Sequence, residues 1–213
     1  MFPSNGQINM DSTFGRKIFD IAQLENIKNI FEVGSWNGQG STVCIMNAIV
    51  TKDDTILYSL EADKFMYDNS IIFWNNYNTK NKLKLLNGTL HNKIVDLKYL
   101  NHIYNNNIPV YNEHYIPEKK IIETTKIINI DIIDTIDFII LDGGEYTTQG
   151  DYDLLITKKP KYIALDDVNV YKCKYIRESL LNNKEWELFS ENLNERNGWS
   201  IFQKTKTDNK VNL

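Results

Sequence analysis

The stretch Phe31-Glu32-Val33-Gly34-Ser35-Trp36-Asn37-Gly38-Gln39-Gly40-Ser41-Thr42 decides the fold of this chain. An apolar run ends in an acid, and three glycines follow immediately before a segment with helical spacing. This order predicts a strand, a tight turn and a helix start that together hold a small cofactor. The dinucleotide fingerprint has the glycine order Gly-x-Gly-x-x-Gly, and the P-loop has a lysine after its last glycine. This stretch has neither pattern, so both of those nucleotide sites are disfavoured.

Strand-like and helix-like segments alternate along the rest of the chain. Apolar runs predict strands at residues 29–33, 55–61, 83–86, 136–142, 161–167, 186–190 and 199–203. Apolar residues at helical intervals predict helices at residues 15–27, 41–50, 63–75, 93–104, 152–157 and 174–181. The alternation predicts an α/β fold with a mostly parallel, seven-stranded sheet and helices on both faces. The last two strands predict an antiparallel C-terminal hairpin.

The length of the chain predicts one domain with one unusual connection. A chain of 213 residues is long enough for one sizeable core and short for two full domains, so we expect residues 1–213 to form a single domain. Residues 91–129 show a weaker pattern and contain Pro109 and Pro117. Because this segment is longer than an ordinary connection, we expect it to be an insertion that forms a lid over the substrate.

Charge and hydropathy exclude some classes of partner. The formal net charge is -4 and the pI is near 5.5, which argues against nucleic-acid binding as the main role. The sequence has neither a signal-peptide pattern nor an apolar run of membrane-spanning length, so we expect a cytoplasmic protein without a membrane partner. Cys44 and Cys173 are far apart and have no metal-ligand spacing, which predicts two ordinary reduced thiols.

The form Glu-x-Gly-x-x-x-Gly-x-Gly, which runs from Glu32 to Gly40, resembles motif I of the class I S-adenosylmethionine-dependent methyltransferases. The resemblance covers most of residues 15–204, because that family also has a Rossmann-like sheet whose final strand runs against the others. It implies that the glycines contact the methionine part of the cofactor and that Glu61 holds both ribose hydroxyls. The cofactor-binding residues that it implies are Glu32, Gly34, Gly38, Gly40, Ser41, Glu61, Asn87 and Asp142.

Acids also follow the fourth and fifth predicted strands, in Asp142-Gly143-Gly144-Glu145-Tyr146 and Leu165-Asp166-Asp167-Val168. Such crowding of carboxylates is unfavourable unless a cation or a proton relieves it, and hard oxygen ligands favour Mg²⁺. The two motifs resemble those of the metal-dependent O-methyltransferases of the catechol, caffeoyl-CoA and macrocin types and of the cephalosporin-hydroxylase-like proteins. The resemblance implies that Asp142, Asp166 and Asp167 bind the metal. The alternative is that the adjacent acids only cap the next helix.

The same resemblance implies that Asp142, Glu145 and Asp166 are the catalytic residues. Methyl transfer is a direct displacement, so the acceptor hydroxyl must be aligned and must lose its proton. Several sugar O-methyltransferases have Asp-Gly-x-His where this chain has Glu145, so this glutamate is either the base or a fourth metal ligand. Other candidates are His91, His102 and His114 as the base, and Lys172, Lys174 and Arg177 as ligands of an acceptor phosphate or as a solvated helix face.

We therefore predict an enzyme, an S-adenosylmethionine-dependent O-methyltransferase assisted by Mg²⁺. Its predicted acceptor is a hydroxyl of a sugar, a nucleotide-linked sugar or another small metabolite. The alternatives are a metal-independent methyltransferase that uses Glu145 alone and a non-catalytic ligand-binding module on the same fold. A nicotinamide-dependent oxidoreductase is disfavoured by the glycine order. The sequence leaves the oligomeric state open, a homo-oligomer included.

Overall fold

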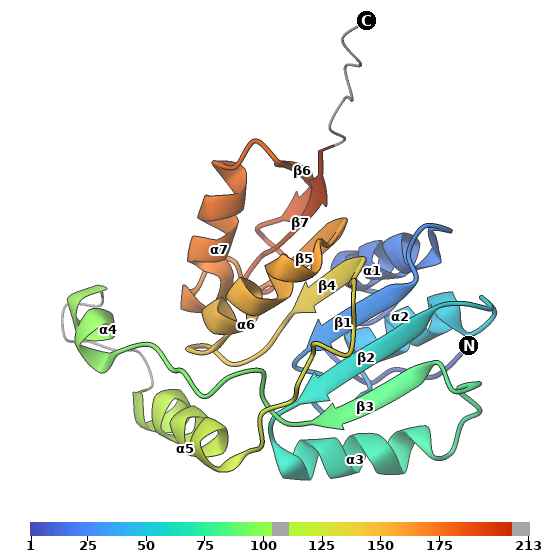
Figure 1. The fold of residues 1–213 in the computed structure, drawn as a ribbon, viewed down its shortest axis with the longest axis horizontal. Coiled ribbons are helices and arrows are strands. Elements are labelled where there is room, and N and C mark those ends of the chain that lie inside the picture. The colour runs from blue at the N-terminus through green and yellow to red at the C-terminus, as the bar shows by residue number, and fades with distance from the viewer. Residues whose placement is uncertain (104–110, 206–213) are drawn as a thin grey trace, which may run out of the picture.

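A computed structural model describes residues 1–103 and 111–205 of the chain. Seven strands form one sheet in the order β3-β2-β1-β4-β5-β7-β6 (Figure 1). They are β1 (Asn29–Val33), β2 (Ile56–Glu61), β3 (Leu83–Asn87), β4 (Phe138–Leu141), β5 (Tyr162–Asp166), β6 (Trp186–Asn192) and β7 (Trp199–Lys204). Strands β1 to β5 pair in parallel, whereas β7 is antiparallel to both β5 and β6. The predicted α/β sheet and its antiparallel hairpin are confirmed.

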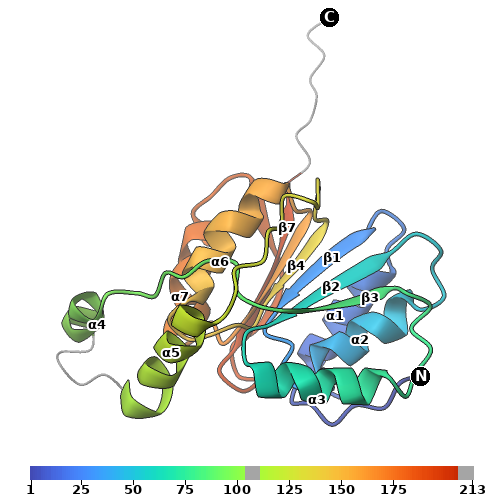
Figure 2. The ribbon, with the colours of Figure 1, turned by 60° about the horizontal axis from the view of Figure 1, so that its bottom comes forward.

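Helices cover both faces of this sheet (Figure 2). Helices α1 (Thr13–Gln23), α2 (Ser41–Ile49) and α3 (Lys64–Trp74) pack on one face, and α6 (Thr148–Leu155) and α7 (Tyr171–Leu181) pack on the other. Neighbouring residues of one strand enter opposite cores, as the alternation of side chains requires. Ile30 packs with α1 and α2, for example, and Phe31 packs with α6 and α7. Within the described ranges, the helices are all too short or too polar to cross a membrane.

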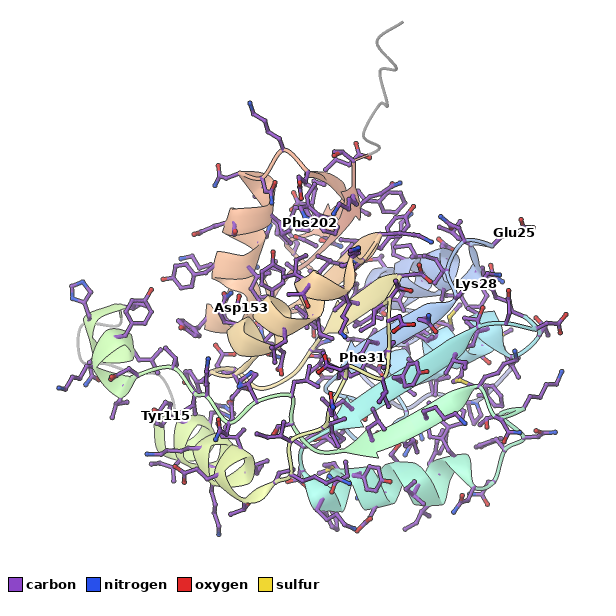
Figure 3. The ribbon with its side chains drawn as sticks, viewed as in Figure 1. Glu25, Lys28, Phe31, Tyr115, Asp153 and Phe202 are labelled. Carbon is purple, nitrogen blue, oxygen red and sulfur yellow. The ribbon has the colours of Figure 1, made fainter. Side chains whose placement is uncertain are left out.

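The order of the strands reverses between β1 and β4, and this position places the functional site. Val33 at the end of β1 pairs with Leu141 at the end of β4, so Gly34 and Asp142 follow side by side. In Figure 3, Lys28 lies before β1 at the amino end of the strands, and Tyr115 lies toward the carboxyl end. Ligands of open parallel sheets bind beyond the carboxyl ends, at the point where the strand order reverses.

The turn of the C-terminal hairpin is fixed against the loop that follows β5. The backbone N–H groups of Val168 and Asn169 donate to the carbonyl oxygens of Gly198 and Asn197, over 3.0 and 2.9 Å. The turn reverses through left-handed backbone at Arg196 (φ 54°) and Gly198 (φ 76°). These contacts bring Arg196 to the end of β5, which sequence spacing alone does not indicate.

The segment between β3 and β4 contains more regular structure than its sequence pattern predicts. It includes α4 (Leu97–Ile103), the π-helical turn η1 (Tyr111–Tyr115) and α5 (Ile116–Thr124), and the start of the expected loop, residues 104–110, lies outside the described residues. Helix α5 replaces an expected loop, because Pro117 occupies the first turn of a helix, where its missing N–H is harmless.

Two helices begin at least three residues earlier than their spacing predicts. Helix α6 begins at Thr148, not at residue 152, and runs into the short 3-10 helix η2 (Ile156–Lys158). Helix α7 begins at Tyr171, not at residue 174. The first turn of α6 contains Gly150 and Asp151, two poor helix formers, so local preference hides the true start.

Candidate functional site

A cavity of about 930 Å³ lies at the carboxyl ends of the strands. Its walls come from the glycine-rich loop after β1, from the ends of β2 to β5, from α5 and from the segment before α1. The lining residues are 5–8, 33–37, 40–41, 60–63, 88–89, 91, 113–114, 117–118, 121–122, 142–145, 147, 151, 167, 172 and 196–197. Both predicted halves of the site, the glycines and the acids after β4 and β5, therefore open into one space.

The glycine-rich loop crosses the end of β1 in left-handed backbone. Gly34 has φ 86°, and its N–H donates to the carbonyl oxygen of Leu60 over 2.9 Å. A Cβ at Gly34 would overlap the carbonyl oxygen of Asp142, so only glycine fits this close approach of two loops. Gly38 has φ 73°, and the indole Nε1 of Trp74 donates to its carbonyl oxygen over 3.1 Å. The buried side chain of Trp74 therefore holds the loop from the side of the core.

Glu32 lies in the core beside the glycine-rich loop. Its carboxylate is fully buried and accepts hydrogen bonds from three hydroxyls, those of Ser41 (2.5 Å), Thr42 (2.7 Å) and Ser59 (2.6 Å). Burial raises the pKa of Glu32, and the three hydrogen bonds oppose that rise. The side chain lies outside the described lining of the cavity and ties the start of α2 to β1 and β2.

Glu61 at the end of β2 lines the cavity and faces the glycine-rich loop. Its Oε2 accepts from the N–H of Trp36 over 2.7 Å, and its Oε1 accepts from the N–H of Asp63 over 2.8 Å. Burial raises the pKa of Glu61 to about 7. Asn87, at the end of β3, donates to the carbonyl oxygen of Glu61 over 3.0 Å and lies outside the described lining. The two carboxylate oxygens of Glu61 retain acceptor capacity beyond these two backbone donors.

Asp142, Asp166 and Asp167, which we call the aspartate cluster, meet at the ends of β4 and β5. One oxygen from each carboxyl group lies within 4.8 Å of the other two. Two cations face them. Lys172 Nζ lies 2.9 Å from Asp142 Oδ1 and 2.6 Å from Asp167 Oδ2, and Arg196 Nη1 lies 3.1 Å from Asp166 Oδ2. The predicted convergence of the three aspartates is present, together with positive charges that the prediction did not include.

The protonation of the aspartate cluster is uneven. Burial, together with the charges of Asp142 and Asp167, raises the pKa of Asp166 to about 8. Burial also acts to raise the pKa of Asp167, but Lys172, Asn197 and Arg196 together outweigh burial and lower it. Asp142 and Asp167 likewise outweigh the burial of Lys172 and raise its pKa above the ordinary range. The proton of the cluster therefore resides on Asp166, the least exposed of the three aspartates.

Glu145 lines the same cavity as Asp142 and Asp167 of the aspartate cluster. Its Oε1 accepts from the backbone N–H of Lys172 over 3.2 Å, and it lines the cavity. Burial raises the pKa of Glu145 to about 7, against the charge of Lys172. A general base with a pKa near neutrality takes a proton efficiently and is still ionised for much of the time at pH 7.

Helix α5 is fastened to the loop after β4 by Glu118. Its Oε1 accepts from the N–H of Tyr146 over 2.9 Å and from the hydroxyl of Thr147 over 2.8 Å. On the same loop, the carbonyl oxygen of Thr147 faces His91 Nε2 at 3.2 Å, and the same nitrogen lies 3.4 Å from Asp151 Oδ1. The segment after β3 therefore forms a wall of the cavity that is bonded to the loop carrying Glu145.

The implied residues fall into two groups. Those that line the cavity are Gly34, Gly40, Ser41, Glu61, Asp142, Glu145 and Asp167, whereas Glu32, Gly38, Asn87 and Asp166 lie behind the described lining. Sequence reasoning missed Arg196, the hydrogen bonds of Glu118, and the ion pairs of Lys172 with the aspartate cluster. Lys172 had a sequence signal, its place five residues after Asp167, but the late prediction of α7 obscured it.

No protein-family model and no curated protein matches the chain. Solved structures do. An O-methyltransferase from Bacillus cereus in complex with SAH has a TM-score of 0.60 at 16% identity, over 92% of this chain and 83% of its own. The O-methyltransferase TomG from Streptomyces achromogenes, involved in tomaymycin synthesis and in complex with SAM, has a TM-score of 0.60 at 12% identity, over 90% and 79%. A methyltransferase from Geobacter sulfurreducens has 0.60 at 10%, over 95% and 83%. This chain therefore has the class I S-adenosylmethionine-dependent methyltransferase fold.

Proposed function

We propose that this protein is an S-adenosylmethionine-dependent O-methyltransferase that acts on a hydroxyl of a small metabolite. One observation carries the proposal: a single cavity joins the glycine-rich loop and Glu61 to Glu145 and the aspartate cluster. A methyl donor and an acceptor must meet in line for displacement, and two separate pockets would not allow it. The likeness to O-methyltransferase structures supports the fold on which this chemistry takes place.

The glycine-rich side of the cavity would bind the cofactor. Gly34, Gly40 and Ser41 line it, and the backbone N–H groups at the start of α2 are suited to a carboxylate. The free acceptor capacity of Glu61 suits the two hydroxyls of a ribose. Three residues outside the lining would support this side of the cavity. Gly38 would hold the loop, Glu32 would hold the start of α2, and Asn87 would hold the end of β3.

The opposite side would bind the acceptor and remove its proton. Bound S-adenosylmethionine would supply an electrophilic methyl group to the acceptor oxygen, with S-adenosylhomocysteine as the leaving group. Glu145 would take the hydroxyl proton, for which a pKa of about 7 is suitable. Charged and amide side chains surround this part of the cavity, Glu118, Lys172, Arg196 and Asn197 among them. Such a polar lining favours a hydroxyl-rich acceptor, a sugar or nucleotide-linked sugar.

Mg²⁺ assistance is part of the proposal, and the aspartate cluster fits such a cation. Asp166 Oδ2 and Asp167 Oδ1 are buried and have no hydrogen-bond partner among the described residues, and oxygen donors of this kind suit Mg²⁺. Asp142, Asp166 and Asp167 would hold the ion, which would supply positive charge that favours an ionised acceptor oxygen. The specific observation that favours the metal-independent alternative, with Glu145 alone as base, is the pair of cations Lys172 and Arg196 already beside these carboxylates.

The first test is calorimetric titration of S-adenosylhomocysteine into the purified protein, with Mg²⁺ and after EDTA. Binding supports the cofactor half and justifies a screen of sugar and nucleotide-sugar acceptors. Absence of binding in both conditions would defeat the methyltransferase proposal. For the cation, Asp167→Asn is expected to abolish turnover and to leave the affinity for S-adenosylhomocysteine nearly unchanged. Unchanged turnover in this variant, at matched Mg²⁺, would exclude the metal-assisted form.

We also propose that the protein acts in the cytoplasm. Cys44 and Cys173 are buried free thiols, a state that a reducing compartment maintains. The proposed acceptors are soluble sugars, which that compartment supplies. Fractionation of the native host, followed by immunodetection, tests this placement, and recovery outside the cytoplasmic fraction would contradict it.

A further inference from the structure

The aspartate cluster contains a cation supplied by the chain itself. Lys172 is the second residue of α7, and its side chain is only 11% exposed. Its Nζ bridges Asp142 Oδ1 and Asp167 Oδ2 at 2.9 and 2.6 Å, and its backbone N–H donates to Glu145. One residue therefore contacts three acids that line the acceptor side of the cavity, Asp142, Glu145 and Asp167.

The remaining oxygens of the aspartate cluster are less well satisfied. Asp166 Oδ2 and Asp167 Oδ1 have no hydrogen bond among the described residues, and Asp166 is 2% exposed. Arg196 stands in front of them as an ion pair, with Nη1 3.1 Å from Asp166 Oδ2 and Nη2 4.0 Å from Asp167 Oδ1. The cluster thus has one face occupied by an ammonium and a second face whose buried oxygens lack a hydrogen bond and face the guanidinium of Arg196.

We propose that Lys172 is a resident counter-ion that controls divalent-cation binding at the aspartate cluster, and that a divalent cation must displace its ammonium from Asp142 and Asp167. This inference rests on the proposed function only for the identity of the site. Like charges that share buried ligands repel strongly, so an ammonium and a divalent cation do not both contact the same two carboxylates.

Charge balance supports the same conclusion. Carboxyl groups bind a metal in their ionised form, and when all three aspartates are ionised they face Lys172 and Arg196 with one net negative charge. A divalent cation added to this arrangement would create an excess of positive charge. Without the ammonium of Lys172, two net negative charges remain, and a divalent cation balances them. Removal of this one positive charge is therefore expected to turn a weak cation site into a strong one.

The test measures Mn²⁺ binding by electron paramagnetic resonance in the wild-type protein and in variants of the full chain. Lys172→Met and Lys172→Gln remove the charge and keep much of the length, and they are expected to bind Mn²⁺ at least about tenfold more tightly than wild type. Lys172→Arg keeps the charge and is expected to bind weakly. Lys174→Met, on the exposed side of α7, is the matched control and is expected to behave like wild type. Asp167→Asn added to Lys172→Gln is expected to remove the gain, which locates the ion.

Equal Mn²⁺ affinity in wild type, Lys172→Met and Lys172→Gln would overturn the inference, and so would absence of binding in all of them. Circular dichroism establishes that each variant is folded. Titration of S-adenosylhomocysteine into the same samples tests the two proposals separately. If the wild-type protein does not bind S-adenosylhomocysteine, the methyltransferase function is defeated, but the comparison of Mn²⁺ affinities still stands.

Discussion

Acids on the two sides of the cavity are stabilised in different ways. On the side of β1 and β2, Glu32 accepts from three hydroxyls and Glu61 from two backbone N–H groups, all of them neutral donors. On the side of β4 and β5, Asp142 and Asp167 are paired with the ammonium of Lys172. Neutral donors fix a carboxylate without cancelling its charge, whereas an ion pair cancels it. The first arrangement suits recognition of an uncharged diol, and the second suits a site where charge changes during reaction.

The largest expected effect concerns Glu145, which contacts Lys172 on the acceptor side of the cavity. Glu145→Gln is expected to lower kcat about 10²- to 10⁴-fold, because the amide cannot take the acceptor proton. In wild type, activity is expected to rise with pH through about 7, since Glu145 has a pKa of about 7 and acts as a base only when ionised. Steady-state kinetics from pH 5.5 to 9, with an acceptor from the screen, measure both quantities.

Glu113→Gln is the matched control for Glu145, since Glu113 lines the same cavity and is exposed. It is expected to retain wild-type turnover and the same rise with pH. The affinity of Glu145→Gln for S-adenosylhomocysteine is expected to stay within about twofold of wild type, because the residue lies on the acceptor side. A Glu145→Gln enzyme with normal kcat would remove the base from this position and leave the histidines of the cavity wall as candidates.

The stability of Glu32 variants tests the hydrogen bonds from neutral donors. Glu32→Ala is expected to lower the free energy of unfolding by about 3 kcal/mol, because three buried hydroxyls lose their acceptor and a cavity remains. Glu32→Gln keeps the volume and one acceptor oxygen, and is expected to cost about 1 kcal/mol. Urea denaturation measures both, with the exposed Glu25→Gln as control. A negligible effect of Glu32→Ala would mean that water replaces the carboxylate and that the hydroxyl network is not structural.

Glu61 tests recognition of the diol on the same side. Glu61→Ala is expected to weaken S-adenosylhomocysteine binding about 30-fold, or about 2 kcal/mol, through loss of charge-assisted hydrogen bonds. Because burial raises the pKa of Glu61 to about 7, wild-type affinity is expected to fall as pH drops below about 7. Calorimetry with the 2′-deoxy analogue separates direct contact from loop disorder. Wild type should discriminate against the analogue and Glu61→Ala should not; equal discrimination by both would place the ribose elsewhere.

The fold and the acids were predictable from sequence because they depend on local pattern. Apolar runs that end in acids or glycines identify parallel strands and their carboxyl ends, and parallel carboxyl ends must meet at one edge of the sheet. Asp142, Asp166 and Asp167 converge for that reason. The cations were not predictable in the same way. Arg196 depends on the register of the antiparallel pairing of β7 with β5, and Lys172 on a helix start that local preference does not mark.

The role of Glu32 shows a second limit of motif reasoning. The motif places an acid before the glycines, and in the structure that acid lies in the core, where it accepts from two hydroxyls at the start of α2 and from one hydroxyl of β2. A motif thus identifies a residue that the site requires without stating whether it touches the ligand. Pro117 gives a similar case, since a residue that usually interrupts a helix here occupies its first turn.

The smallest expected effect tests how completely the cations neutralise the aspartate cluster. Burial and the charges of Asp142 and Asp167 raise the pKa of Asp166 to about 8, from a usual value of 3.8. The folded state therefore binds this proton more tightly than the unfolded state, and stability is expected to fall as pH rises from about 4 to about 8. Asp166→Asn removes that dependence. In EDTA, we expect it to be about 1 kcal/mol more stable than wild type at pH 8.5 and nearly equal at pH 5, by urea denaturation. The exposed Asp134→Asn should show no such trend. A difference that is the same at both pH values would mean that Lys172 and Arg196 keep Asp166 ionised throughout, and that ion pairs rather than protonation compensate its charge.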